Sequence, residues 1–338
     1  VYTVFSDITT YRGDYMASIK DVAKLAGVGV GTVSRVINNN QSVSEATREK
    51  VKWAIEQLDY VPNEVARNFK KQSSQLVGMM IPTIAHPYFS KLVFYVESEL
   101  YKHGYKLLIC NSETEKEKEL QYIEMLKMNQ VAGIIVISYH DFYNKIKIDF
   151  PVITIDRYIS SEIPHVTADN YMGGTLATEA LIKGGCKKLG YLGGGSLIQT
   201  SVTKRKEAFI DIAKKHNIPY VTMEEIVLLH QEYKLARKFL DHYPEVDGVF
   251  TSTDMFAAAL IKELKVRGRR VPEDVQVIGF DGIQDNDLFH PYLSTIEQPV
   301  EQIAQTSVQL LLESIMHKNV PKENILNVRY RKGETSLF

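Results

Sequence analysis

The sequence is poor in cysteine and tryptophan and carries almost no net charge. Two cysteines, Cys110 and Cys186, and one tryptophan occur among 338 residues. Neither cysteine has a second cysteine or a histidine at metal-ligand spacing, and both lie in or beside apolar, strand-like runs. We therefore predict two buried free thiols in a reducing compartment, the cytoplasm, and expect neither a metal site nor a cofactor.

Long apolar runs are also missing. No uninterrupted apolar run reaches the roughly 18 residues that a membrane-spanning helix needs. The opening stretch, "VYTVFSDITTYRGDY", lacks the basic start and the apolar segment of a signal peptide. We expect no membrane span and no secretion signal, and we expect residues 1–16 to be a leader outside the native structure, because a regular helical pattern begins just after Met16.

The net charge of −1 hides an uneven distribution. Residues 16–71 contain nine Lys/Arg against six Asp/Glu, a local charge of +3, which leaves −4 for the remainder. A basic segment attached to a mildly acidic body is consistent with a polyanionic partner for that segment alone.

Three short helical patterns occupy this basic segment. The stretch "IKDVAKLA" places its apolar residues on one helical face, and Ser18 precedes it as an N-cap. "GTVSRVINN" and "SVSEATREKVKWAIEQLDY" follow, the latter opening with a predicted cap at Ser44 and Thr47. A fourth short pattern, "PNEVARNFKK", starts with Pro62 and runs into the polar linker "QSSQ".

The glycines in "AGVGVGTVSRVINN" test whether the segment binds a dinucleotide. A dinucleotide loop needs a strand, then G-x-G-x-x-G, then a helix. Here a helix precedes Gly27, and Gly29 and Gly31 give the spacing G-x-G-x-G, with Thr32 where the third glycine belongs. Helix, glycine turn, helix is instead the helix-turn-helix arrangement, whose second helix enters the DNA major groove. Gly27 suits the left-handed position that ends the first helix.

After Leu76 the pattern changes to short apolar runs that alternate with amphipathic stretches. The runs include "LVGMMIP", "GIIVIS", "VITID", "GVFTS" and "VQVIGFD". Buried strands alternating with helices predict a doubly wound, parallel α/β architecture. About seven strands over some 260 residues indicate two lobes.

Together these motifs resemble the LacI/GalR family of bacterial transcription repressors. The likeness runs from residue 18 to about 333, through "IKDVAKLAGVGVGTVSRVINN", "VGMMIPTIAHPYF", "VTADNYMGG", "VIGFDG" and "PYLSTIEQPVEQIAQTSVQLLLE". It implies a helix-turn-helix head, a hinge helix, and a two-lobed core similar to periplasmic sugar-binding proteins.

The resemblance places the DNA contacts on the second helix and on the hinge. The implied positions are Val30, Gly31, Thr32, Ser34, Arg35 and Asn38, followed by Ala66 and Phe69 in the hinge. Arg35 can read guanine bidentately, while Thr32 and Ser34 suit phosphate contacts. Phe69 stands where the family has a leucine that wedges into the minor groove. Gly29 departs from the polar residue that is usual in the family.

The resemblance also implies an effector site between the lobes. Matching positions give Tyr88, Phe89, Arg157, Asp169, Arg205, Asp254 and Asp281. Carboxylates and arginines around a cleft suit hydrogen bonds to adjacent hydroxyl groups, which favours a carbohydrate or sugar-phosphate effector. The glycine run in "YLGGGS" lacks the Lys-Ser/Thr of a phosphate loop and is interpreted as a turn lining the pocket.

We expect a head at 17–61, a hinge and linker at 62–74, and two lobes. The predicted N-terminal lobe comprises 75–185 and 297–318, and the C-terminal lobe 186–296 and 319–334. No leucine heptad follows the last strand, so we expect a homodimer on a palindromic operator. The alternatives are a sugar-binding receptor without a DNA role and a regulator with a purine-like effector; no acid, base and nucleophile set indicates an enzyme.

Overall fold

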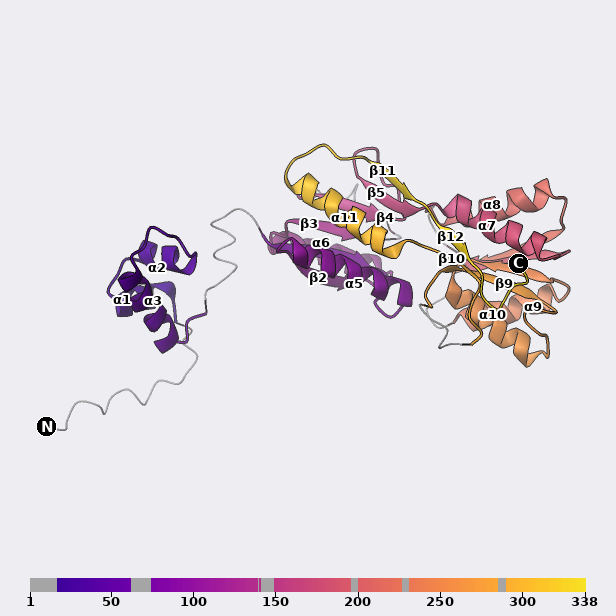
Figure 1. Ribbon diagram of the computed structural model, residues 1–338, viewed down its shortest axis with the longest axis horizontal. Helices are drawn as coiled ribbons and strands as arrows, with labels where there is room; N and C mark the ends of the chain where they lie inside the picture. The colour runs from indigo at the N-terminus through magenta and orange to yellow at the C-terminus, as the bar shows by residue number, and fades with distance from the viewer. Residues whose placement is uncertain are drawn as a thin grey trace, which may run out of the picture. The chain divides into compact units, whose positions relative to one another are not determined.

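The computed structural model describes residues 17–61, 74–138, 140, 149–195, 200–226, 231–284 and 290–338. The chain divides into two units, a headpiece that ends at Ser73 and a core that spans Ser74–Phe338 (Figure 1). The predicted leader, 1–16, and most of the predicted hinge and linker, at 62–73, lie outside the described residues.

In the described part of the headpiece, residues 17–61, the chain forms three helices: α1 (Ile19–Ala26), α2 (Val30–Ile37) and α3 (Glu45–Gln57). Ser18 caps α1 through a capping box with Asp21, as the sequence predicted for Ser18. The cap predicted at α3 differs, because the Ser44 hydroxyl bonds the Thr47 hydroxyl at 2.9 Å instead of a backbone N–H. The helices enclose a small apolar core made of Val22, Ala23, Ala26, Val33, Val36, Val51 and Ala54.

The turn between α1 and α2 depends on Gly27. Its φ of 67° is left-handed, and its N–H bonds the carbonyls that end α1. A side chain would strain this conformation, which explains why glycine closes the first helix. The sequence-based prediction for Gly27 is confirmed.

Two six-stranded sheets form the core. The first sheet has the order β11-β5-β4-β3-β1-β2, and all its pairings are parallel. The second has the order β12-β10-β9-β8-β6-β7 and is parallel except for the edge strand β12. The strands are β1 (Leu76–Ile81), β2 (Lys106–Asn111), β3 (Gly133–Val136), β4 (Val152–Ile155), β5 (His165–Ala168), β6 (Leu189–Gly194), β7 (Tyr220–Glu225), β8 (Gly248–Thr251), β9 (Gln276–Asp281), β10 (Thr295–Glu297), β11 (Glu323–Leu326) and β12 (Arg329–Arg331).

Helices cover both faces of each sheet, so the predicted doubly wound α/β class with two lobes is confirmed (Figure 1). Lobe 1, which contains the first sheet, carries α5 (Pro87–Lys102), α6 (Lys116–Met128) and α11 (Val300–Ile315). Lobe 2, which contains the second sheet, carries α7 (Asn170–Lys183), α8 (Thr203–Lys215), α9 (Glu232–His242) and α10 (Asp254–Val266). The strands are apolar on both sides because each face meets a helix layer.

The chain passes between the lobes at positions that differ from the predicted ones. Helix α7 packs on α8 and β9 of lobe 2, although the predicted boundary at 185 follows it. Strand β11 pairs with β5 of lobe 1, although 319–334 was assigned to the other lobe. Packing decides the lobe of α7 and long-range strand pairing decides the lobe of β11, and hydrophobic periodicity carries no information about either.

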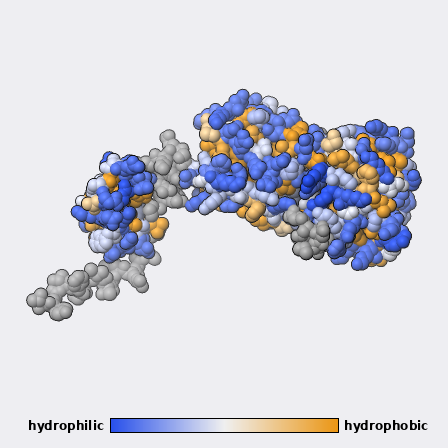
Figure 2. All heavy atoms as spheres, in the orientation of Figure 1, coloured by the Kyte–Doolittle hydropathy of each residue, from blue (hydrophilic) through white to orange (hydrophobic). Residues whose placement is uncertain are grey.

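Both cysteines are buried free thiols, as predicted. Burial raises the pKa of Cys110 to about 11 and that of Cys186 to about 12. Figure 2 shows apolar side chains scattered among hydrophilic ones on the visible surface. Within the described part of the chain, no helix is long and apolar enough to cross a membrane.

Candidate functional site

Helix α2 divides its residues between the head core and the surface. Val33 and Val36 are buried, whereas Val30 keeps 41% of its surface exposed. Arg35, Gly31 and Asn38 are exposed, and Thr32 and Ser34 are half-buried. The positions predicted to contact DNA thus lie on the exposed or half-buried side of the helix and are mostly polar or small residues. Ala66 and Phe69, the predicted hinge contacts, lie outside the described residues.

Two local features position α2. Gly29 is its N-cap and supplies no side-chain hydrogen bond, so the first turn is open on that side. At the other end the Asn38 amide donates to the Ser34 carbonyl at 2.7 Å and closes the last turn. A role in capping therefore accounts for Asn38 alongside its predicted DNA contact.

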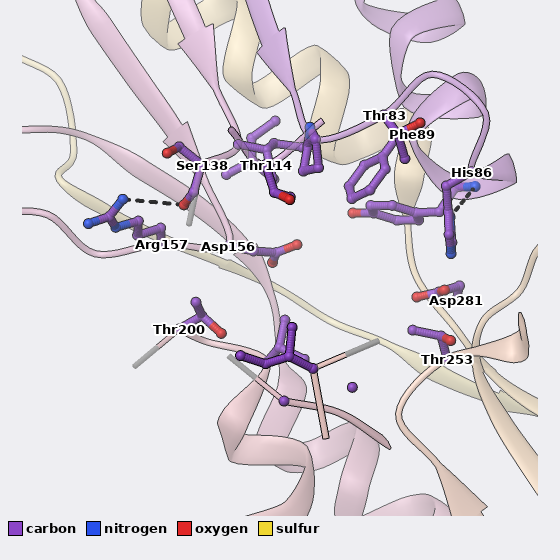
Figure 3. Close-up of a pocket in the computed structure, with 18 of the residues that line it drawn as sticks. Thr83, His86, Phe89, Thr114, Ser138, Asp156, Arg157, Thr200, Thr253 and Asp281 are labelled. Atoms are coloured by element: carbon purple, nitrogen blue, oxygen red, sulfur yellow. Dashed lines mark hydrogen bonds between the residues drawn. The ribbon is translucent and has the colours of Figure 1, made fainter. Parts of the chain in front are cut away.

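Between the lobes of the core lies a cavity of about 580 Å³ (Figure 3). Strand ends of both sheets and the first turns of several helices form its wall, which is where open α/β sheets place ligands. Its lining residues are Pro82, Thr83, His86, Tyr88, Phe89, Glu113, Thr114, Glu115, Ile137, Ser138, Ile155, Asp156, Arg157, Gly194, Gly195, Thr200, Val202, Arg205, Ile226, Glu232, Thr253, Phe256, Asp281 and Gln298.

Arg205, in the first turn of α8, is held by several contacts in this wall. Its Nε donates to Oδ1 of Asn170 at 2.7 Å, and its Nη1 donates to the Ser252 carbonyl at 2.5 Å. The same Nη1 lies 3.7 Å from Oδ1 of Asp281, and both residues are almost fully buried. These contacts fix the guanidinium in the wall of the cavity.

Two carboxylates face this arginine from opposite lobes, the buried Asp281 at the end of β9 and the half-buried Asp156 after β4. Both residues have positive φ, 125° and 57°, a strained backbone that side chains seldom adopt. Gln298 donates to Asp281 at 2.8 Å, and Thr167 donates to Asp156 at 2.8 Å. Loss of hydration raises the pKa of both carboxyl groups, and the Arg205 charge partly offsets that rise.

The predicted aromatic residues and Arg157 complete the lobe 1 side. Tyr88 and Phe89 pack edge to face, with ring centroids 5.4 Å apart, and offer an apolar surface to a ring. The Tyr88 hydroxyl donates to Gln298 at 3.4 Å. Arg157 donates to the carbonyl of Ser138, at 3.3 Å, and to that of His140. These bonds hold its guanidinium at the edge of the cavity (Figure 3).

Two predicted effector residues do not belong to the cavity wall as the described residues define it. Asp169 caps α7 by accepting from the Met172 N–H at 2.9 Å. Asp254 lies behind the wall, where it accepts from the Thr295 hydroxyl at 2.5 Å and from the Ile283 N–H at 2.9 Å. Both carboxylates are used inside lobe 2, as caps and strand links.

Sequence reasoning missed several wall residues. Asp156 directly follows the strand run "VITI", a signal that could have identified it, but the family resemblance pointed to its neighbour Arg157. Gln298 lies within the run "PYLSTIEQPVEQ", but nothing in that run singles it out for a ligand. Thr114 and Glu232 belong to no recognisable motif, because only the approach of two lobes brings them to one space.

Two family models match this chain. Residues 18–63 match the lacI family of bacterial regulatory proteins, and residues 178–336 match the periplasmic binding protein-like domain. The headpiece and much of the core are thus each similar to a described family.

Individual proteins match over nearly the whole length. The sucrose operon repressor of Streptococcus mutans is 38% identical over 323 residues, which cover 95% of this chain and 99% of that protein. The ribose operon repressor of Bacillus subtilis is 39% identical over 299 residues, which cover 88% and 91%. The lac repressor dimer bound to operator and the anti-inducer ONPF has a TM-score of 0.83 at 25% identity and covers 95% of this chain and 99% of that one.

Proposed function

The chain belongs to the lacI family of bacterial regulatory proteins, and from this premise we propose that it is a transcriptional repressor that binds operator DNA under the control of a small carbohydrate. The single observation that carries the proposal is the joining of a helix-turn-helix headpiece to a two-lobed core with a cavity around Arg205 and Asp281. Such a chain is a regulatory protein and not an enzyme.

Helix α2 is the proposed reader of the major groove. Arg35 is exposed on α2 and has the fork of donors that matches O6 and N7 of guanine. Val30 is suited to a thymine methyl group, and Thr32 and Ser34 are suited to phosphates. Asn38, whose amide closes the last turn of α2, is the remaining proposed DNA contact on this helix.

Residues 62–74 are the proposed hinge and linker. Phe69 would enter a minor-groove step of the operator, with Ala66 beside it, and bend the DNA. Replacement of Phe69 by alanine is expected to abolish specific binding and to leave non-specific binding in place. Equal loss of both would argue against the wedge.

The cavity is the proposed effector site, with Tyr88 and Phe89 as a ring platform and Arg205, Asp281, Arg157 and Asp156 as polar contacts. Carboxylate and guanidinium groups form paired hydrogen bonds with neighbouring hydroxyls. A ligand that fits one lobe arrangement better than another shifts the population between them and thereby changes operator affinity. The operon names of the sucrose and ribose relatives support a sugar.

Two copies of the chain are proposed to act together in the cytoplasm on a palindromic operator. A twofold dimer presents two α2 helices to half-sites about one helical turn apart. The lac repressor structure, described as a dimer on its operator, supports this arrangement.

The test is fluorescence anisotropy of a labelled palindromic DNA from the region upstream of the gene, titrated with the full chain at two salt concentrations. Sucrose, ribose, their phosphate esters and purines are then added in turn. Tight, salt-sensitive binding that one sugar changes supports the proposal. Absence of DNA binding under every ligand contradicts it, and a sugar-binding receptor without a DNA role becomes the better account.

A further inference from the structure

The cavity wall carries more acidic than basic side chains. Among the residues the structure describes there, the carboxylates belong to Glu113, Glu115, Asp156, Glu232 and Asp281, and the guanidinium groups to Arg157 and Arg205. An effector in this cavity is therefore surrounded by more carboxyl than guanidinium groups.

Neither guanidinium is held ready for a further anion. Arg205 already donates to Asn170 and to a backbone carbonyl and faces Asp281, and the ring of Phe280 covers one face of it. Arg157 donates to two backbone carbonyls at the cavity edge. A phosphate group would have to displace these acceptors before either arginine could form a bidentate pair of hydrogen bonds with it.

Glu232, by contrast, is a buried acid whose carboxylate has no partner among the described residues. It is 8% exposed, lies in the first turn of α9 and lines the cavity. Its place at a helix N-terminus lets the helix dipole stabilise the charge to a modest extent. The dipole does not replace hydrogen bonds, so the carboxylate keeps its acceptor capacity for a ligand in the cavity.

The other acidic groups differ in how far they are already neutralised. Nζ of Lys118 lies 3.0 Å from Oε1 of Glu113, and this ion pair neutralises the charge of the Glu113 carboxylate. Asp156 and Asp281 each accept a hydrogen bond from a neutral donor but share the single charge of Arg205. Glu115 is exposed to solvent, so the buried and half-buried acceptors left for a ligand are Glu232 on lobe 2 and the two aspartates near Arg205.

Resting on the proposed sugar-responsive function, we propose that the effector is an uncharged sugar and not a sugar phosphate, and that Glu232 is a specificity-determining residue that accepts its hydroxyl groups and repels anions. Sugar hydroxyls donate hydrogen bonds and bring no charge, so they satisfy Glu232, Asp156 and Asp281 together. A phosphate brings negative charge into the same space, where repulsion is only weakly screened.

The experiment is isothermal titration calorimetry of the full chain with matched pairs of ligands, each a sugar and its own phosphate ester. Ribose with ribose 5-phosphate and sucrose with sucrose 6-phosphate are suitable pairs. In at least one pair we expect the free sugar to bind about 100-fold more tightly than the ester, a difference that corresponds to two factors of ten in Kd.

Glu232→Gln keeps the size of the side chain and removes its charge. We expect this variant to narrow the preference for the free sugar by about tenfold, through weaker sugar binding and stronger ester binding. Glu273→Gln, an exposed acid away from the cavity, is the matched control and is expected to keep the wild-type preference. If Glu232→Gln fails to fold, as judged by its melting curve, Asp156→Asn tests the same repulsion.

The possible outcomes distinguish failure of this inference from failure of the proposed function. Tighter binding of an ester than of its sugar, or an unchanged preference in both charge-removing variants, overturns the inference and leaves a sugar-responsive regulator standing. Sugar binding by a chain that binds no operator DNA overturns the proposed function alone. If no member of any pair binds while the operator is bound, the carbohydrate effector and this inference both fail.

Discussion

The guanidinium carbon of Arg205, which lines the interlobe cavity, lies 3.5 Å from the centroid of the Phe280 ring. Phe280 is fully buried on β9, one residue before Asp281, so the strand supplies both the surface on which the arginine stacks and the carboxylate that faces it. The guanidinium is held in one orientation, because it stacks on Phe280 and donates hydrogen bonds to Asn170 and Ser252. This rigid placement makes Arg205 the first residue to test.

Arg205→Lys is expected to weaken effector binding by about tenfold or more and to lower the free energy of unfolding by about 1–3 kcal/mol. Lysine keeps the charge but has no planar group to stack on Phe280, and it has one nitrogen in place of the Nε and Nη1 that bond Asn170 and Ser252. Effector titration and chemical denaturation measure the two effects. Arg270→Lys, at an exposed ion pair, is the control. An effector affinity equal to wild type would remove Arg205 from the site.

The stability of the core is expected to depend on pH through Asp254. Burial raises the pKa of its carboxyl group from 3.8 to about 6, so the folded state disfavours the charged form. Its stabilising contribution is therefore complete below about pH 4 and is lost as the pH rises through about 6. Asp254→Asn cannot ionise, so we expect its destabilisation relative to wild type to be about 3 kcal/mol smaller at about pH 7.5 than at about pH 4.

Urea denaturation of both proteins at several pH values between about 4 and 7.5 measures this difference. Asp274, whose pKa is lowered to about 2 by Arg270, provides a comparison of opposite sign. Its contribution is small because the ion pair is exposed to solvent. A penalty for Asp254→Asn that stays constant with pH would show that Asp254 ionises normally in the folded core.

Arg35→Ala is expected to cost about 1–3 kcal/mol of discrimination between the operator and unrelated DNA. The arginine is the proposed base reader, so specific binding should fall much more than non-specific binding. Lys50→Ala, which removes one exposed charge from α3, should weaken both forms of binding slightly and to the same extent. Anisotropy with operator and scrambled duplexes measures both. Parallel losses for Arg35→Ala would assign it to phosphate contact.

The glycines of the headpiece should respond to substitution in opposite directions. Gly31 lies inside α2 and nothing approaches a Cβ placed there, so Gly31→Ala should stabilise the headpiece by about 0.5–1 kcal/mol. Gly27 has a left-handed backbone, so Gly27→Ala should destabilise it by about 1 kcal/mol. Trp53, the one tryptophan, lies on α3 and reports headpiece unfolding by fluorescence. Equal effects at both positions would show that backbone conformation does not control the cost of a side chain in this turn.

The sequence by itself determined the local features of this protein. Periodicity located the helices of the head, the glycine spacing excluded a dinucleotide loop, and Gly27 was assigned its left-handed turn before the structure confirmed it. Strand runs predicted the doubly wound class because buried parallel strands are apolar on both faces. All of these features depend on residues close together in the chain.

Tertiary structure alone decided which polar side chains share a space. Asp169 and Asp254 follow strands as convincingly as Asp156 does, yet one caps α7, one ties β10 to α10, and only Asp156 reaches the cavity. The same holds for α7 and β11, whose lobes follow from packing and pairing over long separations. Local patterns specify the elements, but the direction of a side chain relative to a second lobe depends on contacts that no short segment contains.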